Sequence, residues 1–197
     1  MVDVPKHIEF ILTYDRYFRS QILYEAIALE ASVDRIIARH FCPDEAKHGE
    51  LVSFVFQEGE IGFNKKIRIV ENLLKHSYPE LKQAFGFLPK RLHALRELRN
   101  QFAHSEVVLP ESPPPPEKAE GITLRHIKNG RVIDEFVSRD KVDALVNESN
   151  YIHLAAILLE MLIRKRVTKQ LAEFDQEDII RLVEAVRDSV QSTRKIP

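Results

Sequence analysis

The spacing of apolar residues constrains this chain more than any other feature of its sequence. From residue 6 to about residue 105, apolar side chains recur every three or four positions, the repeat of one face of an α-helix. Proline and glycine interrupt this pattern, and we predict helices near 6–18, 20–41, 45–57, 63–76, 79–84 and 89–104. Two more are predicted at about 139–166 and 176–192, the last with Asp175 as its N-cap. The pattern therefore predicts a mainly helical protein.

Between residues 110 and 137 the sequence predicts a connector and a β-hairpin instead of helix. Residues 110–121, "PESPPPPEKAEG", hold five of the ten prolines and predict an extended connector, or alternatively a ligand for a proline-recognising domain. The stretch "ITLRHIKNGRVIDEFV" alternates around Asn129-Gly130, which predicts a β-hairpin at about 122–137. The expected fold class is all-α: a helical bundle in one domain, residues 1–197, with one inserted β-hairpin.

Charge and cysteine content limit the possible functions. The 29 basic and 30 acidic side chains give a net charge of −1, so contact with nucleic acid would require a local basic patch. Cys42 is the single cysteine, which excludes an intrachain disulfide and a cysteine-based zinc site and fits a reducing compartment.

Targeting and ligand motifs give no further signal. The N-terminus lacks the features of a secretory signal, and His153 and Glu160 interrupt the most apolar window, residues 151–163. We therefore expect a cytoplasmic protein that does not enter a membrane. The histidines lack metal-ligand spacing and the glycines form no phosphate loop, so no metal or cofactor is expected.

The stretch "RELRNQFAHS", residues 96–105, places polar side chains at the end of an apolar helix. In a helical projection, Arg99 lies about 40° from the centre of the apolar stripe, where a guanidinium needs an anionic partner. Glu30 on the 20–41 helix is the expected partner, with Asp34 as the second choice. One interpretation of such a pair is a structural tie between two helices, and the other is part of a functional site.

His104 follows Arg99 by five residues, which separates the two by about 140° around a regular helix. They would share a face only if the helix loosened before His104, and the loss of pattern after Ser105 suggests such an ending. Arg96, Asn100 and His104 form a polar ridge at four-residue intervals.

These residues resemble a known motif. "R-N-Q-F-A-H", Arg99 to His104, resembles the R-x4-6-H signature of the HEPN superfamily, including a polar residue after the arginine and a small residue before the histidine. The preceding "LHALRELRNQFAHS" is similar to the final core helix of that family. The resemblance covers about residues 7–105 and the later long helix.

The resemblance implies a dimeric, metal-independent endoribonuclease in a defence, stress or toxin-antitoxin setting, with the motif of both protomers lining one cleft. Arginine supplies a fixed cation for a phosphorane, and histidine accepts or donates a proton near neutral pH. By position, Arg99 would stabilise the phosphate, and His104 would act as general acid or base. Asn100 would orient the phosphate or His104, and Glu30 would hold Arg99 in place. The basic residues Lys90, Arg91, His93 and Arg96 would contact RNA.

Two departures keep a second function open. Glu106 stands where one toxin subgroup has a tyrosine, and the hairpin resembles insertions in mannitol-repressor-like and other uncharacterised members, some of which look like regulators. The alternative is therefore a noncatalytic HEPN-like regulator or protein-interaction module. An antitoxin or a regulatory protein is a possible partner in either case.

Overall fold

A computed structural model describes residues 6–42, 44–57, 61–110, 112–168 and 175–192. The chain begins with α1 (Lys6–Tyr14), a π-helical turn η1 (Asp15–Arg19) and α2 (Ser20–Phe41). These segments are continuous, so the prediction of separate helices at 6–18 and 20–41 is wrong at the break between them. Neither proline nor glycine occurs there, and the wider turn buries Phe18 without ending the helix.

The segments that follow α2 are shorter. They are η2 (Glu45–Lys47), α3 (His48–Leu51), η3 (Val52–Gln57), α4 (Phe63–Asn72), η4 (Leu73–Ser77), η5 (Pro79–Leu81), α5 (Lys82–Phe85) and α6 (Leu88–His104). Pro89 lies in the first turn of α6, where an N–H has no partner within the helix. The helix predicted at 89–104 is confirmed almost to the residue.

The C-terminal half returns to long helices. Ser138 caps α7 (Arg139–Val167) by accepting a hydrogen bond from the backbone N–H of Lys141. Asp175 caps α8 (Gln176–Ser192) in the same way, with its carboxylate accepting from the backbone N–H of Glu177 at 2.9 Å. The predicted N-cap of the last helix is confirmed.

Along the sequence, a small antiparallel sheet separates α6 from α7, in the order β1 (Glu106–Val108), β2 (Gly121–Lys128) and β3 (Arg131–Ser138). The predicted hairpin is confirmed: Asn129 and Gly130 form its turn with φ of 52° and 73°, as a type I′ turn requires. β1 was not predicted, because three residues between a helix and a proline-rich segment carry too little pattern.

Two clusters of buried side chains hold the structure together. The larger one joins α2, α4, α6, α7 and α8. The smaller one packs the inner face of the sheet against the first helical segment and the end of α6, and Leu98 contacts both clusters. Phe102 and Leu124 are fully buried in the smaller cluster, so the sheet is anchored to the same helix that carries the arginine-histidine motif.

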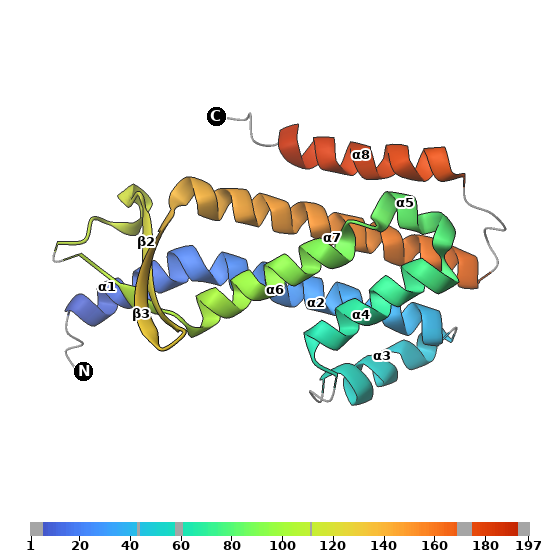
Figure 1. Ribbon diagram of the computed structural model, residues 1–197, viewed down its shortest axis with the longest axis horizontal. Coiled ribbons are helices and arrows are strands. Elements are labelled where there is room, and N and C mark those ends of the chain that lie inside the picture. Colours follow the sequence, from blue (N-terminus) through green and yellow to red (C-terminus); the bar gives the residue numbers. More distant parts are fainter. Residues whose placement is uncertain (1–5, 43, 58–60, 111, 169–174, 193–197) are drawn as a thin grey trace.

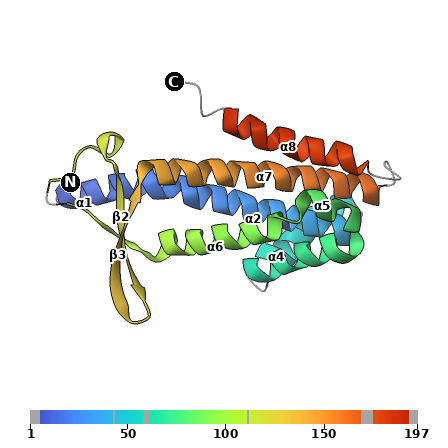
Figure 2. The same ribbon diagram turned by 45° about the horizontal axis from the view of Figure 1, so that its top comes forward.

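Figures 1 and 2 show an elongated bundle in which α2, α6 and α7 run along the long axis. The hairpin projects from one end, and α3, α4 and α5 thicken the other. α8 packs against the outer side of α7. None of the described helices has both the length and the apolar composition needed to cross a membrane.

Candidate functional site

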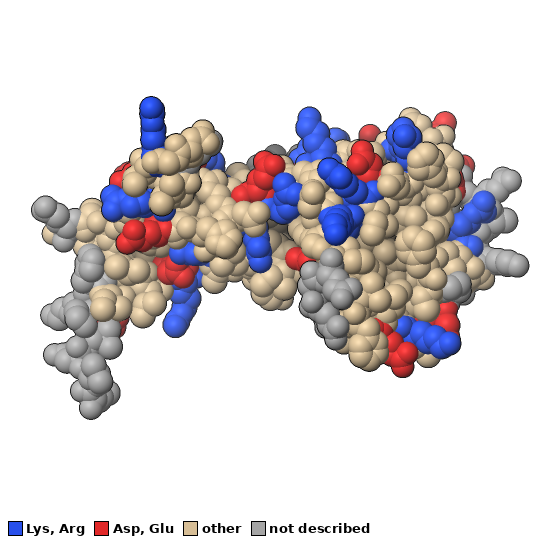
Figure 3. Space-filling model, turned by 60° about the horizontal axis from the view of Figure 1, so that its bottom comes forward, with Lys and Arg blue, Asp and Glu red and all other residues tan. Residues whose placement is uncertain are grey.

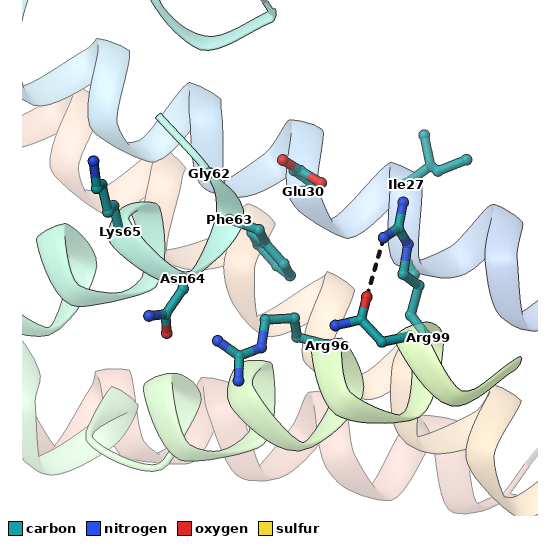
Figure 4. A pocket seen from close by; sticks show the side chains of 10 residues that line it. Ile27, Glu30, Gly62, Phe63, Asn64, Lys65, Arg96 and Arg99 are labelled. Carbon is teal, nitrogen blue, oxygen red and sulfur yellow. Dashed lines mark hydrogen bonds between the residues drawn. The ribbon is translucent and has the colours of Figure 1, made fainter. Parts of the chain in front are cut away.

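A cavity of about 390 Å³ opens between α2, the start of α4 and the C-terminal half of α6. Figure 4 shows the side chains of these three elements around it. Its lining includes the predicted site residues Glu30, Arg96, Arg99 and Asn100, together with residues that were not predicted, among them Asn64 and Lys65. Residues from separate predicted helices therefore meet at one site.

Arg99 is exposed at this cavity, which corrects the prediction that it lies within the apolar stripe. Its guanidinium donates a hydrogen bond to the side-chain carbonyl of Asn100 at 3.1 Å (Figure 4). No carboxylate lies within 4.0 Å of Arg99 in the described part of the chain. Its donors are therefore directed to a neutral amide and to solvent, and an incoming anion can reach them.

Arg96 lies one turn before Asn100 on α6 and is half-buried at the same cavity. Its nearest carboxylate is that of the exposed Glu97, at 3.5 Å. The Nε atom of Arg96 is buried without a hydrogen-bond partner among the described residues. Arg96 therefore adds a second cation with unused hydrogen-bonding capacity.

Glu30 also lines the cavity, but the predicted Glu30–Arg99 ion pair is wrong. The Glu30 carboxylate instead accepts a hydrogen bond from Lys66 Nζ at 3.0 Å. Lys66 is buried on α4, and its ammonium lies 2.9 Å from Asp34 and 3.3 Å from the backbone carbonyl of Phe56. Burial raises the pKa of the Asp34 carboxyl, and the hydrogen bond from Lys66 opposes that rise. Lys66 thus takes the role that we predicted for Arg99.

The start of α4 contributes residues to the same cavity. Gly62, Phe63, Asn64 and Lys65 all line it. The first N–H groups of a helix have no partner within the helix, and the helix dipole makes this end attractive to anions. The basic character of "FNKK", residues 63–66, was the signal in the sequence for this contribution.

His104 occupies a different position from Arg99. It is exposed, it is the last residue of α6, and it does not line the cavity. The helix stays regular through His104, so the predicted loosening before it is wrong, and the two side chains point about 140° apart. One protomer therefore does not bring Arg99 and His104 together.

The end of α6 is held by an interaction that the sequence did not reveal. Arg19, in the π-helical turn of the first helical segment, donates hydrogen bonds to the backbone carbonyls of Ala103 at 3.2 Å and Ser105 at 3.1 Å. These are carbonyls of the last helical turn and its cap, which have no partner within α6. Arg19 therefore fixes the segment that carries His104.

The other predicted RNA contacts fall in two places. Lys90 lines a second cavity, of about 550 Å³, beside α4 and α5. Arg91 points elsewhere: it pairs with Glu148 on α7, and its guanidinium lies over the rings of Phe87 and Tyr151. Lys90 is thus available to a ligand, whereas Arg91 serves packing between α6 and α7.

Among the described residues, no group of three histidine, cysteine, aspartate or glutamate side chains could hold a metal ion. Comparisons with protein-family models, curated proteins and solved structures found no match to this chain. The functional argument therefore rests on the residues and their geometry.

Proposed function

We propose that this protein is a HEPN-type, metal-independent endoribonuclease that acts as a homodimer. The observation that carries the proposal is the exposed Arg99 guanidinium, paired with Asn100 rather than a carboxylate and facing a cavity that Arg96 and the start of α4 also line. An arginine held this way binds a phosphodiester with two parallel hydrogen bonds.

In the proposed reaction, the 2′-oxygen of the RNA forms a bond to the adjacent phosphorus, and the bond from phosphorus to the 5′-oxygen breaks. The products are a 2′,3′-cyclic phosphate and a free 5′-hydroxyl. Arg99 and Arg96 stabilise the negative charge that develops on the non-bridging oxygens, and Asn100 holds Arg99 in position. His104 accepts the proton of the 2′-hydroxyl or donates one to the leaving oxygen.

A second copy of the chain completes the proposed site. Because α6 stays regular through His104, the imidazole and the Arg99 guanidinium of one chain leave the helix in different directions. In a two-fold dimer, the exposed His104 of one protomer can face the cavity of the other. We propose that Arg99 and His104 act across the dimer interface.

A second candidate function is a noncatalytic regulator or protein-interaction module. The position of His104 outside the cavity favours it, as does the exposed outer face of the hairpin, where Ile127, Val132 and Phe136 are more than half exposed. In that case the cavity would bind a phosphate without cleaving it, and the hairpin would contact a partner protein.

The proposed setting is the cytoplasm, where the single free Cys42 would remain reduced. A defence or toxin-antitoxin role, with an antitoxin or a regulatory protein as partner, belongs to the same proposal. Such a partner would control the nuclease by covering the cavity.

The test is incubation of purified protein with single-stranded and structured RNA in excess chelator. We expect cleavage by the wild type, loss of cleavage in Arg99→Ala and His104→Ala, and no change in Arg16→Ala, a control at an exposed arginine outside the cavity. The product should carry a cyclic phosphate. Absence of cleavage by the wild type across several RNAs, with RNA still bound, would favour the regulator.

A further inference from the structure

The second cavity is a basic groove on a protein that is nearly neutral overall. It is lined by α4, η4, α5 and α6, and its lining contains the cationic or titratable residues Arg68, Lys75, Lys82, Lys90 and His93. Glu71 is the acidic residue among the described residues that line it. The whole chain has a net charge of −1, so this excess of positive charge belongs to the groove and is not a property of the whole surface.

The cations of this groove are not used in ion pairs. Arg68, Lys75, Lys82 and Lys90 are exposed, and the described part of the chain places no carboxylate within 4.0 Å of them. Cations elsewhere on the bundle differ: the single carboxylate of Glu160 binds both Arg35 and Arg39. The groove therefore keeps its charge available to a ligand.

One wall of the groove is formed by α4 and η4. Asn64, Arg68, Glu71 and Lys75 follow one another by four, three and four residues, which places them on one face. Asn64 lines the first cavity, and the other three line the second. This face therefore runs from one cavity into the other over about 16 Å, at 1.5 Å per residue.

The opposite wall is formed by α6, which packs against α4. Asn100, Arg96, His93 and Pro89 are spaced by four, three and four residues and share a face. Asn100 and Arg96 line the first cavity, whereas His93 and Pro89 line the second. Figure 3 shows Lys and Arg side chains gathered over the part of the molecule where α4 and α6 lie side by side. The two cavities are thus ends of one basic track.

We propose that this track binds the phosphate backbone of a single RNA strand that extends from the Arg99 cavity to the α4–α5–α6 groove. The inference rests on the proposed function, because it places the scissile phosphate in the first cavity. Arg68 and Lys75 on the α4 wall are seven residues, about two helical turns, apart, and Arg96 and Lys90 are cations of the α6 wall. Cations spaced along both walls suit a ligand that repeats one negative charge per unit. RNA is such a ligand, and its affinity then depends on the length that occupies the track.

The experiment measures binding of a fluorescent RNA dinucleotide, which is too short to span the track, and of a fluorescent single-stranded RNA of about 16 nucleotides, over a range of salt concentrations. The variant Arg68→Gln/Lys75→Gln/Lys82→Gln removes three charges from the second cavity only. The control Arg16→Gln/Lys47→Gln/Lys165→Gln removes three exposed charges that line neither cavity. Both are made in the His104→Ala background, so that the RNA stays intact.

We expect the groove variant to bind the longer RNA about tenfold or more weakly at low salt and to lower the slope of log affinity against log salt by about 2. Its affinity for the short RNA should stay unchanged, and the control should match its parent. Equal affinities and slopes for the groove variant and the control would overturn the proposal. Preferential binding of a charge-matched polyglutamate would overturn it in favour of an acidic protein partner.

A cleavage assay separates this inference from the proposed function. In this assay the wild type and the groove variant both keep His104. If RNA binding depends on the groove but no cleavage occurs, the nuclease proposal fails and the track remains. If cleavage depends on Arg99 but the groove variant binds the longer RNA like the control, the track fails and the nuclease proposal remains.

Discussion

The ammonium of Lys66 lies 2.9 Å from the carboxylate of Asp34 in the interior between α4 and α2, and both side chains are buried. Glu30 joins the same ammonium from the edge of the Arg99 cavity, 3.0 Å away. A buried charge without a partner is very costly, so this interaction links the packing of α4 to one wall of the candidate site.

Replacement of Lys66 by methionine should therefore destabilise the protein by about 3–5 kcal/mol, because Asp34 would remain as an uncompensated buried charge. The double variant Lys66→Met/Asp34→Leu should recover most of that loss, since both charges are then removed. Urea unfolding of the two variants and the wild type measures the difference. Equal destabilisation in the single and double variants would contradict the importance of the pair.

Arg99→Ala should change the free energy of unfolding by less than about 0.5 kcal/mol, because Arg99 is exposed and donates its hydrogen bond to the neighbouring Asn100. RNA cleavage should nevertheless be lost. Thermal unfolding measures the stability of the variant, and the RNA cleavage assay measures its activity. A loss of several kcal/mol would instead assign Arg99 a structural role.

Gly121→Ala should destabilise the sheet, because an added Cβ would lie 2.2 Å from the backbone carbonyl oxygen of Val137 on β3. We expect a loss of about 1–3 kcal/mol, as for other overpacked positions. Gly49→Ala is the matched control: a Cβ there meets no atom within 4 Å, and we expect it to be neutral or slightly stabilising. Chemical unfolding of both variants gives the comparison.

Stability should fall in mild acid partly through His40. Burial lowers the pKa of His40 from its ordinary value of 6.5, and its Nδ1 atom lies 2.9 Å from the hydroxyl of Tyr78. The unfolded chain therefore binds more protons than the folded chain just below pH 6.5, so the free energy of unfolding decreases as pH falls through that range.

His40→Gln should make the loss of stability between pH 7 and about pH 5 smaller than in the wild type. Burial also lowers the pKa of His153, but that residue is present in both proteins, so its contribution cancels in the comparison. Urea unfolding at several pH values measures the effect. An identical pH dependence in the two proteins would show that His40 does not contribute to it.

The sequence predicted the long helices and the hairpin because both have strong local signals. The apolar repeat of α6 and the Asn129-Gly130 turn each depend on neighbouring residues only. The prediction for Arg99 was wrong because a helical projection gives the direction of a side chain but not the element that the side chain meets there. α4 begins only at Phe63, and the cavity beside its first turn leaves Arg99 exposed.

The partner of Glu30 could be identified only from the way that α2 and α4 pack. Lys66 precedes the buried Val70 by one helical turn and therefore lies on the apolar face of α4, which predicts a buried lysine that needs a carboxylate. That signal was present in "FNKKIRIVENLLK", but the sequence alone did not show that α4 crosses α2 at Glu30 and Asp34.

The central claim is that Arg99 of one protomer acts with His104 of another, and mixing two inactive variants tests it most directly. Arg99→Ala and His104→Ala protein are combined in equal amounts, allowed to exchange subunits, and incubated with RNA in excess chelator. In a two-fold dimer, half of the molecules then carry one complete site, so activity should return to about a quarter of the wild-type value. A mixture that stays inactive, while the wild type cleaves RNA under the same conditions, would contradict the shared site.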